Sequence, residues 1–139
     1  MGKLDQLKQT RLAELRAMGQ EGILRELERA KKAGWKSDKI VLNKIRLHQR
    51  EWGREDMTVE EFRRISQHTK DNPASRIFTY IHDVLPHHRG YYFISPQGEV
   101  IHYRVDEDLN KSCYKPKDLA KYLRGRKHWI EIDREGRIL

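Results

Sequence analysis

The sequence contains one cysteine and no long apolar segment among its 139 residues. A single thiol, Cys113, excludes an internal disulfide and a zinc site made of cysteines. No apolar run approaches the roughly 20 residues that a membrane-spanning helix needs. The polar first residues also do not resemble a signal peptide. We therefore expect a cytoplasmic protein that does not contact a membrane.

Motifs that would indicate an enzyme are also missing. Gly90, Gly98 and Gly125 stand alone, whereas a phosphate-binding loop needs several glycines directly before a helix. The serines and the cysteine do not lie in a sequence context typical of a catalytic nucleophile. The sequence therefore predicts no catalytic residue, no cofactor and no metal site.

Positive charge is present in excess. Lysine and arginine number 29 against 21 aspartate and glutamate residues, which gives a net charge of +8. Such a balance favours polyanionic partners, because phosphates that are neutralised by a protein release their condensed counterions. The alternative interpretation is a solvated surface charge that serves only solubility.

Residues 1–56 are predicted to form a basic helical region, the first of two parts of the chain. They hold 14 of the basic residues and 9 of the acidic ones. Apolar residues at helical spacing predict three helices, each followed by a glycine, and Ser37 is expected to cap the third. The predicted helices cover about 4–18, 21–33 and 37–52.

Residues 57–139 are predicted to form an α+β domain with two β-hairpins. The domain opens with a helix, because Thr58 and Glu61 have the spacing of a capping box. A further helix is predicted over 77–85, after Pro73, from apolar residues at helical spacing. This segment is also rich in residues that favour strands.

In the rest of this domain the apolar residues alternate, which is typical of strands. Strands are predicted over 91–95 and 99–105, and a second hairpin over 129–139. A loop is expected over 106–112, and a short helix from Pro116 separates the hairpins. The predicted fold class is α+β, with N-terminal helices followed by a small antiparallel sheet of two hairpins with a connecting helix (ββαββ).

Residues suited to DNA contacts line one face of the predicted helix over 37–52. The opposite face carries the apolar residues Val41, Ile45 and Trp52. Arginine suits guanine edges, asparagine suits adenine edges, and lysine suits phosphates. The preceding helix and the short turn resemble a helix-turn-helix arrangement. The first candidate set consists of Lys39, Asn43, Arg46 and Arg50.

A second group of cations surrounds the short helix that follows Pro116. Leu119 and Leu123 are expected to face the core, so the cations should face solvent. Gly125 would let a phosphate approach the backbone closely. Nearby aromatic residues could stack on bases if exposed, or belong to the core. The second candidate set consists of Lys117, Lys121, Arg124, Arg126 and Lys127.

Histidines suggest one further function. His87 and His88 precede a hairpin, as in small metal-dependent nucleases where a histidine activates water beside a cation. The following helix offers Asp118 but no histidine or asparagine ligand, and the alternative is a polar turn that happens to be rich in histidine. His102 is expected to be exposed, because it alternates with apolar neighbours along its strand.

The leading hypothesis is a small basic nucleic-acid-binding or regulatory protein, with duplex DNA favoured over RNA. Both candidate sets would contact phosphates, and the first would also reach base edges. The alternative is an interaction protein of the kind that phages and mobile elements encode. Its basic faces would meet an acidic protein surface, and it would inhibit or adapt a larger enzyme or nucleoprotein complex.

Overall fold

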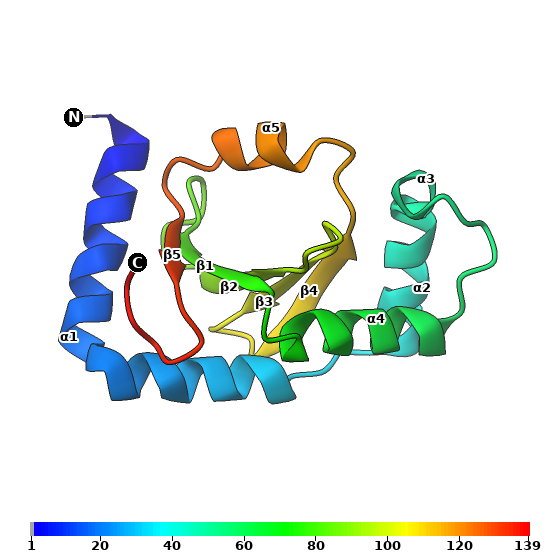
Figure 1. Cartoon of the computed structure of the whole chain (residues 1–139), viewed down its shortest axis with the longest axis horizontal. Helices are drawn as coiled ribbons and strands as arrows, with labels where there is room; N and C mark the ends of the chain where they lie inside the picture. The colour runs from blue at the N-terminus through cyan, green and yellow to red at the C-terminus, as the bar shows by residue number, and fades with distance from the viewer. Residues whose placement is uncertain (1) are drawn as a thin grey trace.

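A five-stranded antiparallel sheet lies between helices on both faces in the computed structural model, which describes residues 2–139 (Figure 1). Helices α1 and α4 lie against one face of the sheet, and the short helix α5 lies against the other. The strand order is β4-β3-β2-β1-β5. The predicted fold class is therefore confirmed, with helices first and a helix between strands of the sheet.

Helix α1 (Lys3–Lys32) joins the first two predicted helices across a kink at Gly19. The backbone of Gly19 has φ 72° and ψ 172°, a conformation that only glycine adopts without strain. The two halves of α1 consequently run in different directions, one beside the sheet and one beneath it (Figure 1). The predicted stop at Gly19 is thus a change of direction rather than a connecting loop.

Helix α2 (Asp38–Leu47) begins where predicted, because the backbone N–H of Ile40 donates to Ser37 Oγ at 3.3 Å. The predicted single helix is interrupted at His48, and a short helix α3 (Gln49–Trp52) follows. Gly53 ends α3 in the left-handed conformation, with φ 65°.

Helix α4 (Val59–Asp71) confirms the predicted cap, since the Glu61 N–H donates to Thr58 Oγ1 at 3.1 Å. Its fully buried residue Phe62 lies between two tryptophans. The Phe62 ring centroid is 5.2 Å from that of Trp35 and 6.3 Å from that of Trp52. This aromatic cluster fixes α2 and α3 against α4.

The helix predicted over 77–85 is wrong, because Arg76–Ile81 forms strand β1 near the middle of the sheet. Ile77 and Phe78 are both buried although they point to opposite faces. A strand that is buried on both faces has a continuous run of apolar residues. Such a run contains apolar residues at helical spacing as well as at strand spacing, so periodicity does not distinguish the two. The β-branched and aromatic residues decided the outcome.

The predicted loop over 106–112 is also wrong in part, because Leu109–Tyr114 forms the edge strand β4. Its register against β3 shifts between His102 and Tyr103. Polar residues and an irregular register are typical of edge strands, and they hide the alternation that identifies inner strands.

The remaining elements agree with the predicted connections. A turn at Gly98 joins β2 to β3 as expected, and Asp118 caps α5 by accepting from the Lys121 N–H at 3.0 Å. The second hairpin is reduced to β5 and one bridge between Ile132 and Ile138. These elements are β2 (Arg89–Ile94), β3 (Val100–Arg104), α5 (Leu119–Arg124) and β5 (Ile130–Ile132).

A buried arginine ties the first half of α1 to the sheet. Arg11 is 2% exposed, and its Nε donates to Thr79 Oγ1 on β1 at 3.1 Å. Its guanidinium also donates to Glu14 at 3.0 Å and to Glu26 at 3.2 Å. Glu26 accepts from the Tyr91 hydroxyl at 2.6 Å as well. Glu14 lies one turn along the same half of α1, and the kink at Gly19 brings Glu26 of the second half to the same guanidinium.

Hydrophobicity along the helices is low. Among residues 2–139, we find no helix with the length and the apolar character that crossing a membrane requires.

The only cysteine, Cys113, is fully buried in the core, and burial raises the pKa of its thiol to about 12. A thiol with such a pKa is protonated at neutral pH and is a poor nucleophile.

Candidate nucleic-acid interface

All members of the first candidate set are exposed, on α2 and α3. They lie opposite Val41 and Ile45, which are buried in the core. Within residues 2–139, none of the three cations of this set forms an ion pair. The exposed side chains Leu42 and Leu47 lie on the same helix. Trp52 is partly buried and packs against the core.

The second candidate set surrounds α5. Four of its five cations are exposed, and Arg126 is half-buried. The Arg126 guanidinium lies over two aromatic rings, 4.1 Å from the Tyr122 centroid and 5.8 Å from the Trp129 centroid. In the part of the chain that the structure describes, no carboxylate pairs with any cation of this set. Their charges therefore remain free for a partner.

An aromatic contact brings these two sets near each other. The His48 ring, at the end of α2, stacks on Tyr114 of β4 with centroids 5.2 Å apart. The Tyr114 hydroxyl in turn contacts the Tyr122 hydroxyl of α5. The two sets consequently lie on either side of the end of β4 (Figure 1). Acids also lie in this region: Glu51 contacts His48 Nδ1 at 2.8 Å, Glu55 lies beside Arg46 and Arg50, and Asp118 caps α5.

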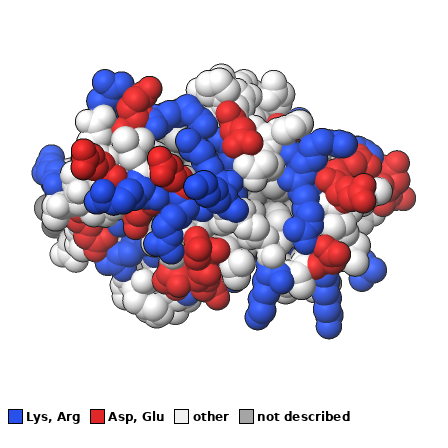
Figure 2. Space-filling model, turned by 90° about the horizontal axis from the view of Figure 1, so that it is seen from below, with Lys and Arg blue, Asp and Glu red and all other residues white. Residues whose placement is uncertain are grey.

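Charges are mixed on the face formed by α4 and the second half of α1. Figure 2 shows lysine and arginine side chains beside aspartate and glutamate side chains across this face. Ion pairs join Arg63 to Asp38 and Arg54 to Glu61, each at 2.6 Å. Other cations of α1 and α4, such as Arg25 and Arg64, form no ion pair within residues 2–139, so this face holds both paired and unpaired cations.

Aromatic side chains fill the space between the sheet and α5. The Tyr92 ring stacks on Trp129 at 4.0 Å and on His102 at 4.3 Å. The expectation that His102 is exposed is wrong, because α5 and Trp129, in the loop after α5, cover this face of the sheet as well. Burial lowers the pKa of His102 to about 3, so its imidazole is neutral and its Nε2 can accept from the Tyr80 hydroxyl at 2.5 Å.

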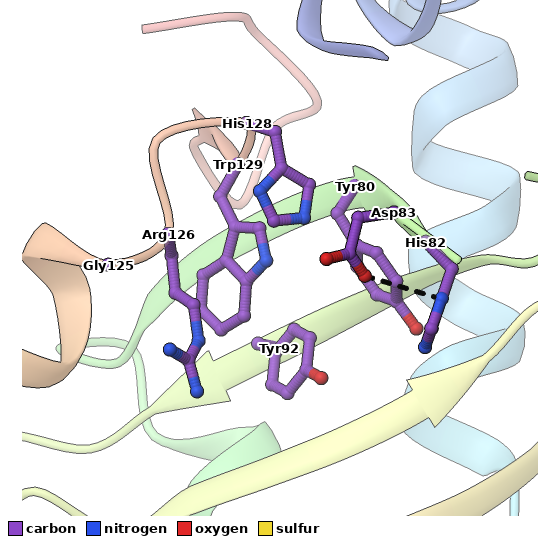
Figure 3. A pocket seen from close by; sticks show the side chains of 8 residues that line it. All are labelled: Tyr80, His82, Asp83, Tyr92, Gly125, Arg126, His128 and Trp129. Carbon is purple, nitrogen blue, oxygen red and sulfur yellow. Dashed lines mark ion pairs between the residues drawn. The ribbon is translucent and has the colours of Figure 1, made fainter. Parts of the chain in front are cut away.

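A cavity of about 310 Å³ opens beside this aromatic cluster (Figure 3). It lies between the loop that follows β1 and the loop that connects α5 to β5. Aromatic rings form part of its wall, and charged and imidazole groups form the rest. The lining residues are Tyr80, His82, Asp83, Tyr92, Gly125, Arg126, His128 and Trp129. Among these, the sequence had indicated Arg126 as a cation of the second candidate set, Gly125 as a point of close phosphate approach, and Trp129 as a residue that could stack on bases if exposed.

The histidine pair does not form a metal centre. His88 is buried and His87 is exposed, with ring centroids 4.2 Å apart. Nowhere in residues 2–139 do three or more histidine, cysteine, aspartate or glutamate side chains converge as metal ligands would. The pair lies in the turn before β2.

Comparisons with protein-family models, with curated proteins and with solved structures found no match to this chain. Function is therefore argued from the chemistry of the chain alone. The free cations on α2, α3 and α5 and the cavity beside β5 are the two features that bear on it.

Proposed function

We propose that the protein binds nucleic acid, with duplex DNA as the preferred form, through the two candidate sets together. The observation that carries this proposal is the absence of ion pairs for every cation of both sets within residues 2–139. Exposed cations without carboxylate partners are available to phosphates, and each phosphate that they neutralise releases counterions.

The arrangement around β4 adds to this argument. Contacts of His48 and Tyr114 hold the ends of α2 and β4 together, and Tyr122 extends the contact to α5. Cations from segments that are distant in sequence can thus reach phosphates of one bound molecule. The exposed face of α2 supplies Arg46 and Asn43, which are side chains that suit guanine and adenine edges.

Salt dependence of binding is the first test. We expect the affinity for a random-sequence duplex, measured by fluorescence anisotropy, to fall with a log–log slope of about −4 to −5, as for contacts to about five phosphates. A slope between zero and −1 would show that the cations do not contact phosphates.

Substitution of the first set is the second test. Arg46→Ala together with Arg50→Ala should weaken duplex binding by about 1–3 kcal/mol for each contact that is lost, while the melting temperature changes little because both side chains are exposed. The matched control is Arg16→Ala with Arg25→Ala, which removes two exposed cations from α1. Equal weakening by both pairs would indicate a general effect of net charge.

Exposed apolar side chains on α2 favour a second function, which is docking on an acidic protein. The side chains of Leu42 and Leu47 are 42% and 70% exposed. Leu47 also lines an open hollow of about 460 Å³, together with Arg46, Arg50 and Gly53. Apolar residues ringed by cations suit a protein surface that combines both characters. Leu47→Asp would abolish such docking and weaken duplex binding only through its added charge.

A further inference from the structure

The cavity beside β5 contains a buried polar atom that lacks a partner. His128 is 8% exposed, and its Nδ1 makes no hydrogen bond within residues 2–139. Three other side chains, those of Trp35, Trp52 and Asn110, also hold such an atom, but they do not line this cavity. Buried polar atoms in folded proteins nearly always have a partner. A ligand or a water in the cavity would supply one for His128.

The walls of this cavity carry both signs of charge. Arg126 comes from the loop before β5 and is held in place by the Tyr122 and Trp129 rings. Asp83 comes from the loop after β1, and its carboxylate lies 3.5 Å from His82 Nδ1 (Figure 3). No ion pair joins Asp83 to Arg126 in the described chain. A ligand that satisfies both must carry an anionic group and also hydrogen-bond donors.

The imidazoles add hydrogen-bonding groups. The backbone N–H groups of Val84 and Leu85 each donate to His82 Nδ1 at 3.0 Å. These two bonds require Nδ1 to be the acceptor, so a ring proton lies on Nε2, which can donate. Burial lowers the pKa of His128, which keeps that ring neutral at pH 7. Arg126 is therefore the group that supplies positive charge inside this cavity.

We infer that the cavity binds one nucleotide unit, with its phosphate at Arg126 and the N–H or O–H groups of its base or ribose at Asp83. The inference rests on the proposed function, because the nucleotide would be an unpaired or terminal residue of the bound nucleic acid. A volume of about 310 Å³ lies at the lower end of the range of about 300–1,000 Å³ that is typical of small-molecule sites. Tyr80, Tyr92 and Trp129 form part of the wall, with the Tyr92 ring packed between Trp129 and His102, so the ligand would be held mainly by its polar groups.

Calorimetric titration with nucleoside 5′-monophosphates tests this assignment directly. The probes are AMP, GMP, CMP and UMP, each compared with its unphosphorylated nucleoside and with inorganic phosphate. We expect at least one nucleotide to bind at least tenfold more tightly than both its nucleoside and inorganic phosphate. The nucleoside lacks the group for Arg126, and inorganic phosphate lacks the base and ribose donors for Asp83.

Two variants test which residue contacts the phosphate and which contacts the base or ribose. Arg126→Gln should weaken nucleotide binding at least tenfold, to the affinity of the nucleoside. Asp83→Asn should weaken nucleotide binding at least fivefold and leave the affinity for inorganic phosphate unchanged. Arg64→Gln is the matched control, because it removes an exposed cation from α4, on the other side of the sheet. That control should leave every affinity unchanged.

Three outcomes would overturn the inference. These are the absence of nucleotide binding, equal affinities for nucleotides and inorganic phosphate, and unchanged nucleotide affinity in both variants. Asp83 is exposed, so Asp83→Asn decides the matter even if Arg126→Gln fails to fold. If the protein bound duplex DNA through Arg46 and Arg50 but bound no nucleotide, this inference would be overturned and the proposed function would stand. Nucleotide binding without duplex binding would overturn the proposed function and leave the cavity a nucleotide site.

Discussion

The two faces of the sheet are built differently. The face toward α1 and α4 carries Tyr91, Phe93 and Ile101, each 0% exposed, and a buried arginine network closes it. The face toward α5 is covered by a helix of six residues, none of which is buried. Aromatic rings pack beneath that helix, and a cavity opens beside it, at the loop that connects α5 to β5. The first face is therefore closed by fully buried side chains, whereas the second borders an open cavity.

Among the substitutions on the face toward α1 and α4, Phe62→Ala should lower the free energy of unfolding the most. This residue is fully buried between two tryptophans, and truncation of a buried phenylalanine costs about 3–5 kcal/mol. Urea denaturation would measure the loss in the free energy of unfolding. The comparison variant is Leu123→Ala in α5, where the side chain is partly buried. If Leu123→Ala cost as much as Phe62→Ala, the two faces would contribute equally.

Arg11→Ala should cost about 3 kcal/mol, because it leaves Glu26 and Thr79 without their buried partner. The control is Arg16→Ala, one turn further along α1, where the side chain is exposed. Chemical denaturation should separate the two variants clearly. Surface substitutions usually change the free energy of unfolding by no more than about 0.5 kcal/mol. A loss within that range for Arg11→Ala would show that α1 is held by its apolar residues alone.

Acid should destabilise the second face through His102. Its pKa is lowered from an ordinary 6.5 to about 3. Between these values the unfolded chain binds more protons, so the free energy of unfolding falls as the pH falls, by up to about 1.4 kcal/mol per pH unit. His102→Gln should flatten this dependence between pH 6.5 and pH 4, whereas His68→Gln, an exposed control on α4, should not. Identical pH profiles for wild type and His102→Gln would contradict the burial of this imidazole.

Gly19→Ala should have the smallest effect of this series. At φ 72° and ψ 172° an alanine is strained by about 1–3 kcal/mol, although nothing lies within 4 Å of the added Cβ. We expect a lower melting temperature and unchanged duplex binding. Gly53→Ala is a comparison variant, because Gly53 also has a positive φ, 65°, and an added Cβ would be strained there without a clash. A neutral Gly19→Ala would show that α1 can bend elsewhere to reach the sheet.

Local signals in the sequence were sufficient wherever the structure depends on neighbouring residues. Ser37 and Thr58 cap their helices because each side chain accepts a backbone N–H three residues further on. Gly53 and Gly98 mark turns because their backbones have positive φ. The exposure of the first candidate set followed from helical periodicity, which placed Val41 and Ile45 on the opposite face.

The errors arose where partners far along the chain decide the structure. Residues 77–81 were predicted as helix because a strand buried on both faces loses its alternation. The edge strand β4 was predicted as loop because few of its residues are buried. His102 was placed on the correct face of its strand, but the cover on that face comes from α5 and Trp129, which lie further along the chain.

By itself, the sequence determined the α+β class, the helix caps, the turns and the exposure of the first candidate set, because each depends on composition or on residues within a few positions. Only the tertiary structure decided that Tyr114 joins the two candidate sets and that Asp83, Arg126 and His128 line one cavity. These residues lie on different elements, and their distances are set by the pairing of β1 with β5 and by the packing of α5 on the sheet. Periodicity along a single element carries no information about such pairings.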